Sequence, residues 1–321
     1  MKALTLKDLE KELKSLKGKT AITFHSIGDV DALASAFALK IAIKNSKVFR
    51  IDSLNSQARK VWGRLNLTLD AFPSNSLDGI DNLIFVDVST PTLLGNLRKE
   101  VENYKGNLIV IDHHLHNAPL HGKHYVDATK TSCSQVVHEI LKALKKHEDP
   151  GISILIALGI ISDTANLKSA DNSTIFALGE CLKNSTMELQ EIYDLLDVSP
   201  DISEKIAVLE ACKRAQIERI GDLVIASSQV SAFELKSAAG LISLGCDFAV
   251  VSNQKDGKLS ALKSKAFALR KIHVGKLLDK FARQLHGSGG GHEIVGGANF
   301  LHGMDALTCC DKILAAVREE L

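Results

Sequence analysis

The chain has 321 residues, of which 45% are apolar, and this is enough material for two hydrophobic cores. Lysine and arginine total 39 against 38 acidic residues, a balance that argues against a protein holding long duplex nucleic acid mainly by neutralising its phosphates. Small anionic substrates fit this balance, since a local basic patch needs no net charge.

The cysteines and the N-terminal stretch indicate where the protein works. None of the six cysteines belongs to a CxxC pair, which indicates reduced thiols and no thiolate metal site. The first residues show a helical rhythm of leucines among lysines and glutamates, without a secretory apolar core. No apolar run reaches the about 18 residues that a membrane span requires. We therefore expect a soluble, cytoplasmic protein with no membrane partner.

Residues 1–197 predict an open, mainly parallel sheet with flanking helices, because short apolar runs alternate with helical or turn segments. The predicted strands are 20–24, 48–51, 83–86 and 108–111. The predicted helices are 31–44, 134–146, 152–166, 172–182 and 186–196. The expected fold class is therefore α/β.

Residues 198–321 predict a second, smaller α/β domain, because a Ser-Pro-Asp break at 199–201 separates them from the helices before. Its predicted elements are a helix at 202–214, strands at 223–227, 248–252 and 258–263, a helix at 274–285, a glycine-rich turn at 287–292 and a helix at 305–319. Because an apolar stretch follows the turn, we expect its backbone amides to hold an anion. The alternative is a flexible linker.

Acidic and histidine residues follow the predicted strands of the first domain. His25, Asp87 and Asp112 each come at or directly after the end of one strand. Since ligands of open α/β sheets gather at the carboxyl ends of the strands, these groups should meet at one rim. Such a negative rim requires bound cations, and cations beside a water are the equipment of a hydrolase.

Further ligand-type residues extend this cluster. Asp29 and Asp31 share a short loop with His25, and the alternative role for either is to cap the following helix. His113 and His114 follow Asp112, for which a turn or capping role is the alternative. Asp163 ends a strongly apolar helix, where negative charge is unfavourable without a cation. Oxygen and imidazole donors suit manganese or magnesium.

These segments together resemble the DHH phosphoesterase superfamily. The matching features are its His-x-x-x-Asp-x-Asp loop, its strand-end Asp, its Asp-His-His triplet followed by Asn117, and its later Asp-Thr. The run from Gly289 to His292 is similar to the glycine-rich signature of the DHH-associated C-terminal domain, so the resemblance covers nearly the whole chain.

The resemblance implies a two-metal centre, usually of Mn2+, with Mg2+ or Co2+ as alternatives. It assigns one ion to His25 and Asp29, the other to Asp31, His113 and Asp163, and a bridging role to Asp87. Asp112 would orient an imidazole, and His114 would stabilise charge on the phosphoryl oxygens. The substrate-binding residues would be Gly289, Gly290, Gly291, His292, Lys263 and Asn117, with Lys263 standing where relatives usually carry Arg.

The resemblance and the neutral charge together favour hydrolysis of short single-stranded oligonucleotides or of 3'-phosphorylated nucleotides. Few aromatic residues are available for stacking along a longer strand. The alternatives are a RecJ-like single-strand exonuclease, a cyclic dinucleotide phosphodiesterase, or a non-catalytic nucleotide-binding regulatory module. A homodimer is left open.

Overall fold

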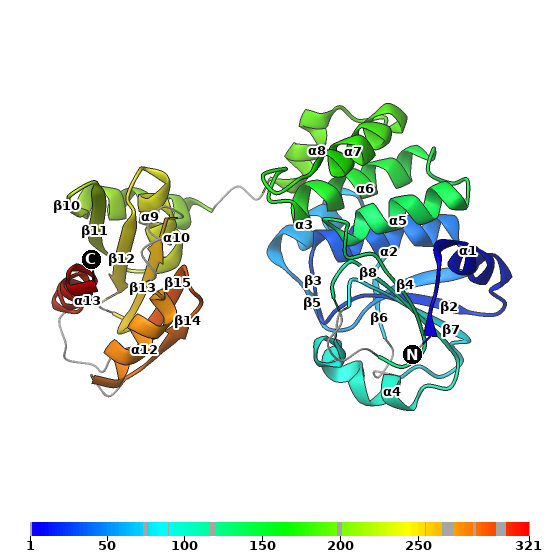
Figure 1. The fold of residues 1–321 in the computed structure, drawn as a ribbon, viewed down its shortest axis with the longest axis horizontal. Coiled ribbons are helices and arrows are strands. Elements are labelled where there is room, and N and C mark those ends of the chain that lie inside the picture. The colour runs from blue at the N-terminus through cyan, green and yellow to red at the C-terminus, as the bar shows by residue number, and fades with distance from the viewer. Residues whose placement is uncertain are drawn as a thin grey trace. The chain divides into compact units, whose positions relative to one another are not determined.

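The computed structural model describes residues 2–72, 76–88, 90–115, 120–197, 201–253, 255–264, 272–284, 287–299 and 306–320. The chain divides into two compact units, Met1–Val198 and Ser199–Leu321 (Figure 1). Each unit has its own sheet and its own hydrophobic core. Within the described ranges, none of the helices combines the length and the apolar character needed to cross a bilayer.

The first unit is built on a seven-stranded sheet whose strand pairs are all parallel. In spatial order the strands are β1 (Lys2–Ala3), β9 (Lys123–Val126), β8 (Asn107–Asp112), β7 (Asn82–Val86), β2 (Thr20–Thr23), β4 (Ser46–Arg50) and β6 (Asp70–Ala71). Two further short strands, β3 (Ile27–Gly28) and β5 (Ser53–Leu54), pair with each other. The mainly parallel α/β sheet predicted from the sequence is confirmed.

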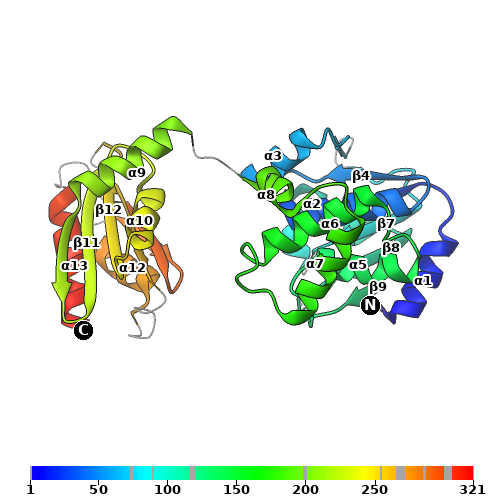
Figure 2. The same cartoon turned by 90° about the horizontal axis from the view of Figure 1, so that it is seen from above.

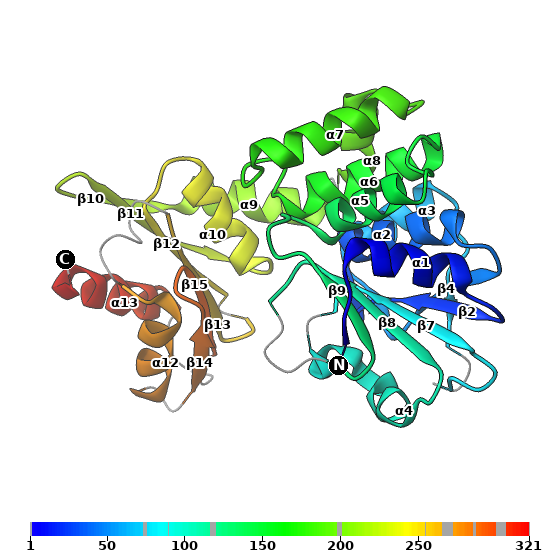
Figure 3. The same ribbon diagram turned by 45° about the vertical axis from the view of Figure 1, so that its right-hand side comes forward.

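Helices cover both faces of this sheet, which explains why its central strands are buried almost throughout. On one face, residues such as Ile22, Ile84 and Ile109 pack under α2 (Val30–Ala42), α5 (Cys133–Ala143) and α6 (Pro150–Asp163). On the other face, Leu83 and Phe85 pack against η2 (Pro91–Leu97) and α4 (Arg98–Asn103). Figure 3 shows α2 and α5 above the strands and α4 below them. The remaining helices are α1 (Leu6–Ser15), α3 (Ser56–Arg64), α7 (Asn172–Asn184) and α8 (Leu189–Leu196).

The second unit contains a six-stranded mixed sheet. Its strands, in spatial order, are β10 (Gln216–Ile220), β11 (Leu223–Val230), β12 (Phe248–Asn253), β13 (Lys258–Lys263), β15 (Val295–Asn299) and β14 (Ser288–Gly291). One face packs against α9 (Ile202–Arg214) and α10 (Glu234–Ser243), and the other against α12 (Val274–Gln284) and α13 (Ala306–Glu320). Figure 2 shows α10 and α13 on opposite faces of the sheet. The role of this unit as a separate substrate-binding domain stays a prediction.

Three local predictions were wrong. The helix expected at 134–146 ends at Ala143. The glycine-rich segment is an edge strand, β14, paired antiparallel with β15, and not a turn. The helix expected to run to residue 166 ends at Asp163, because Ala165, Asn166 and Leu167 have left-handed φ values of 50°, 57° and 67°. Glycine fits the edge strand for a packing reason: a Cβ on Gly289 would lie 2.6 Å from the Leu278 carbonyl oxygen of α12.

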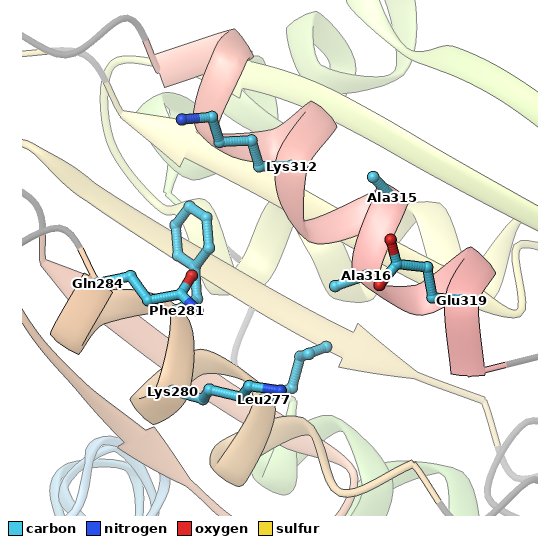
Figure 4. A pocket seen from close by; sticks show the side chains of 8 residues that line it. All are labelled: Leu277, Lys280, Phe281, Gln284, Lys312, Ala315, Ala316 and Glu319. Atoms are coloured by element: carbon cyan, nitrogen blue, oxygen red, sulfur yellow. The ribbon is translucent and has the colours of Figure 1, made fainter.

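A hollow of about 680 Å³ lies between α12 and α13 in the second unit (Figure 4). Leu277 and Phe281 of α12 face Ala315 and Ala316 of α13 across it. Its lining includes none of the residues that the sequence predicts to bind substrate.

Candidate metal centre

The carboxyl ends of three neighbouring parallel strands carry the predicted ligands. The chain leaves β2 into the loop that holds His25, and it leaves β7 at Asp87. The last residue of β8 is Asp112, directly before His113. Parallel pairing gives these strands the same direction, so their ends meet at one edge of the sheet. Asp163, the last residue of α6, adds a further carboxylate.

Asp87 is the residue that connects the cluster. Its Oδ2 lies 3.5 Å from His25 Nε2, while its Oδ1 lies 3.6 Å from His113 Nε2 and 3.4 Å from His114 Nδ1. The side chain is buried, and its Oδ1 has no hydrogen-bond partner among the described residues. A buried carboxylate oxygen without a hydrogen-bond donor is costly unless a cation compensates it.

Among the described residues, the potential ligand atoms form three overlapping groups, one of which joins Asp87 to Asp112, His113 and His114. The other two correspond to the two ions that the sequence predicts. In the first group, atoms of His25, Asp29 and Asp87 all lie within 4.8 Å of one another. In the second, the same holds for Asp31, His113 and Asp163. Both groups offer only carboxylate oxygens and imidazole nitrogens, the donors that suit hard or borderline divalent ions such as Mg2+ and Mn2+. The residues present therefore fit a pair of such ions.

The first turn of α5 holds Asp31. The Cys133 amide donates to Asp31 Oδ2 at 2.7 Å and the Ser134 amide donates to Oδ1 at 2.8 Å. Burial raises the pKa of Asp31 well above its usual value, and the nearby charges of Asp87 and Asp163 raise it further. A cation in the second group would remove this cost. These two amide donors were not predicted from the sequence, although Ser132, the helix N-cap, is a recognisable signal for the start of α5.

Asp29 combines two functions that the sequence left as alternatives. Its Oδ1 accepts the Ala32 amide at 3.0 Å and so caps α2, while its Oδ2 lies 3.6 Å from His25 Nε2. Burial alone would raise the pKa of Asp29, but contacts with His25 and the capping amide lower it. Capping one helix therefore does not prevent the same carboxylate from facing the cluster.

The remaining titratable groups respond to the same crowding. Burial is the main reason why the pKa of Asp163 rises to about 6. Burial would lower the pKa of His25, but its contacts with Asp29 and Asp87 outweigh burial and raise the pKa to about 10. In the absence of metal, a protonated His25 thus partly neutralises the acidic rim.

Asp112 organises the two histidines that follow it. Its Oδ1 accepts the His113 amide at 2.7 Å and the His114 amide at 3.1 Å, and it lies 2.9 Å from His114 Nδ1. This last contact is the main reason why the pKa of His114 is raised. His113 Nδ1 lies 3.3 Å from the Lys130 carbonyl oxygen, a contact that leaves its Nε2 directed at the cluster. His114 is half exposed.

The residues predicted to bind substrate, unlike the predicted metal ligands, lie in the second unit where the structure describes them. Gly289, Gly290 and Gly291 lie in β14, with Gly289 at a groove of about 400 Å³ on the sheet surface, and His292 is exposed beside them. The His292 amide donates to the Val295 carbonyl oxygen at 2.7 Å, so it closes the hairpin. Asn117 lies outside the described residues.

Lys263 is buried inside the second unit. Its Nζ donates to the Ile272 carbonyl oxygen and lies 3.6 Å from Glu293 Oε1. Its ammonium is therefore already engaged within the unit. A role in substrate binding stays a prediction.

Comparisons with known proteins identify the family of the chain. The model of the DHH family, N-terminal domain, matches residues 19–160. The chain is 30% identical over 288 residues to an uncharacterised protein of Methanocaldococcus jannaschii, covering 86% of this chain and 85% of that protein. It is 24% identical to the bifunctional oligoribonuclease and PAP phosphatase NrnA of Thermus thermophilus over 325 residues, 96% of this chain and 92% of that protein.

A solved structure supports the fold. The exopolyphosphatase-related protein from Bacteroides fragilis matches with a TM-score of 0.69 at 16% identity, over 98% of this chain and 96% of that chain. From its family match, its relatives and its acidic cluster, we conclude that the chain belongs to the DHH family of phosphoesterases.

Proposed function

We propose that the protein is a two-metal phosphoesterase that hydrolyses short single-stranded oligonucleotides or 3'-phosphorylated nucleotides. The observation that carries the proposal is the position of Asp87, whose two oxygens face His25 on one side and His113 on the other. Two ligand groups sharing one carboxylate are what a pair of ions needs to act on the same water and phosphate.

His25 and Asp29 would hold one ion, Asp31, His113 and Asp163 would hold the other, and Asp87 would bridge them. Manganese is the proposed metal, with Mg2+ or Co2+ as alternatives, because imidazole and carboxylate ligands occur together. When bound, the ions supply the Lewis acidity that lowers the pKa of an attacking water.

The chain's own residues orient the reacting groups. Asp112 fixes the His114 ring through the contact at Nδ1, so the outer edge of the ring is available to a phosphoryl oxygen. Because the contact with Asp112 raises the pKa of His114, the ring favours the cationic form that would stabilise charge developing on phosphate. The Asp31 carboxylate is buried and accepts two backbone amides, and these bonds fix its position in the second ligand group.

The substrate class rests on two supporting observations. A relative that this chain matches over 96% of its length is named for oligoribonuclease and PAP phosphatase activities. The balance of 39 basic and 38 acidic residues gives no sign of the basic path that a long strand would require. The groove at Gly289 and Gly297 is the proposed contact for the non-scissile part of the substrate.

The test is turnover of a substrate panel with Mn2+. The panel contains dinucleotides, single strands longer than ten nucleotides, 3'-phosphoadenosine 5'-phosphate, a cyclic dinucleotide and pyrophosphate. We expect turnover of dinucleotides and of the 3'-phosphorylated nucleotide, and its loss in Asp87→Ala. The exposed Asp222→Ala, on the second unit, is the matched control and should keep full activity. A preference for the long strands would replace the proposal by an exonuclease, and no turnover of any substrate by metal-loaded protein would favour a regulatory module.

A further inference from the structure

A polar pocket of about 500 Å³ lies in the first unit, where the ends of three helices meet. Gln57 belongs to the first turn of α3, Asn166 follows the end of α6, and Tyr193 belongs to α8. Three other residues that line the pocket are Gln190, Asp194 and Asp197. None of these residues takes part in the proposed metal centre.

Two hydrogen bonds connect α3, at the pocket, with segments that lead into the proposed metal centre. The hydroxyl of Ser162, the residue before Asp163, donates to Gln57 Oε1 at 3.4 Å. On the other side, the amide of Asn55, which caps α3, donates at 2.8 Å to the carbonyl oxygen of Gly28, the residue before Asp29. These two bonds thus tie α3, which supplies Gln57 to the pocket, to the residues that precede one proposed ligand of each metal group.

The lining chemistry selects against phosphate and in favour of a neutral, hydrogen-bonding ring. Two carboxylates, of Asp194 and Asp197, line the pocket. Arg64 lies beside it, and its Nη1 donates to the backbone carbonyl oxygens of both residues. The two carboxylates outnumber this one cation, which disfavours an anion. The carboxamide of Asn166 supplies both donors and an acceptor, whereas Gln190 Nε2 already donates to Asp194 Oδ1 at 3.0 Å and leaves its oxygen as an acceptor. The half-buried ring of Tyr193 supplies an aromatic surface.

The backbone presents Asn166 to the pocket at a cost. Ala165, Asn166 and Leu167 all have φ values in the left-handed region, between 50° and 67°. A residue other than glycine in the left-handed region costs about 1–2 kcal/mol of conformational energy. Local backbone strain of this kind clusters at functional sites. The Leu167 amide donates to Thr164 Oγ1 at 3.2 Å, and this bond holds the turn directly after Asp163.

We propose that this pocket is a nucleobase subsite, which holds the base of the nucleotide whose phosphate lies at the metal centre. Carboxylate and carboxamide oxygens accept hydrogen bonds from exocyclic amino groups, so adenine, guanine and cytosine are favoured over uracil. The inference rests on the proposed function, because it assigns the base of that substrate. It goes further, because it names the surface in the first unit that reads the base.

The test compares two ligands that differ only in the base. AMP and ribose 5-phosphate are titrated calorimetrically against the full-length protein loaded with Mg2+, and the ratio of their affinities isolates the base. We expect AMP to bind about tenfold more tightly, the size of one base–aromatic contact. Tyr193→Leu and Asn166→Ala should each bring the ratio close to one while the affinity for ribose 5-phosphate stays unchanged.

Three controls make the result specific to the pocket. Tyr193→Phe keeps the ring and should keep the ratio. Asn103→Ala, which removes an exposed carboxamide on α4 of the same unit, should have no effect. UMP should bind less tightly than AMP to the unchanged protein, and this difference should shrink in Asn166→Ala.

The outcomes separate this inference from the proposed function. An affinity ratio near one in the unchanged protein, or a ratio that neither variant alters, overturns the nucleobase subsite even if oligonucleotides are hydrolysed. If no phosphoester is hydrolysed and the ratio still falls in both variants, the subsite stands and the proposed catalytic function fails.

Discussion

Gly159 of α6 lies directly against Asp31 of α2. A Cβ on Gly159 would be 2.8 Å from Asp31 Oδ1 and 1.9 Å from Ser134 Oγ, so even a methyl group has no room. The absence of a side chain at position 159 is therefore what allows α2, α5 and α6 to close around the buried Asp31 carboxylate, the proposed metal ligand. The cost of burying that ligand is offset by the two amides of α5.

Gly159→Ala should weaken metal binding. The added methyl group must displace Asp31 or Ser134, and overpacking of this kind costs about 1–3 kcal/mol. Disturbing the groups that support a ligand typically lowers metal affinity about 10–100-fold. Calorimetric titration with Mn2+ measures the affinity. The matched control is Gly179→Ala on α7, where a Cβ meets nothing within 4 Å, and this variant should bind metal normally. Equal metal affinity in both variants would contradict the steric account.

Without metal, the protein should become less stable as pH rises. The folded-state pKa of His25 is about 10, above its unfolded value of 6.5, so its stabilising contribution is complete below pH 6.5 and is lost toward pH 10. The folded-state pKa of Asp163 is about 6, above its unfolded value of 3.8. Ionisation of Asp163 therefore also lowers the stability of the fold as pH rises from 3.8 to about 6. Thermal unfolding in a chelator should therefore give a higher Tm at pH 6 than at pH 9.

Metal should reverse this trend, because proton release from the ligands favours binding as pH rises. The same melting series with saturating Mn2+ should show a larger metal-induced increase in Tm at pH 8 than at pH 6. His25→Ala in chelator should flatten the decline between pH 6.5 and 10. A decline that persists unchanged in His25→Ala would assign it to other groups.

Asp112→Asn should reduce turnover more than substrate binding. The amide that replaces the carboxylate no longer raises the pKa of His114, so less of that ring is cationic at neutral pH. We expect kcat to fall by about 10–100-fold, within the range for one general acid–base or electrostatic group. The pH profile of kcat is the informative measurement, because the decline of kcat on the alkaline side should begin at a lower pH in the variant. His114→Ala should lower kcat to a similar level, and the double variant should add little further loss.

Lys263→Met should destabilise the second unit. The substitution leaves the Ile272 carbonyl without its donor and removes the ion pair with Glu293, with an expected cost of about 1–3 kcal/mol. Urea unfolding measures this cost. If Lys263 instead contacts substrate, as expected from the sequence, the variant should raise KM with little change in unfolding. Glu293→Gln, which keeps the shape of the partner, separates the ion pair from the hydrogen bond.

Local sequence patterns were sufficient for the parts of the protein whose signals lie close together in the chain. Apolar runs ending at His25, Asp87 and Asp112 predicted both the parallel strands and the rim where their ends meet. This works because side-chain burial fixes the strands, and parallel direction then fixes the edge. The α9 helix and the β13 strand were also predicted with the boundaries that the structure shows.

Only the tertiary structure decided the contacts between segments distant in sequence. The Asp31 carboxylate reaches the amides of Cys133 and Ser134 across about one hundred residues, and no local pattern encodes such a pairing. The glycine run became an edge strand because Gly289 must lie against α12, a packing requirement that reads locally as turn chemistry. Sequence thus determined the kinds of ligand and the rim they share, whereas close packing decided which groups hold them there.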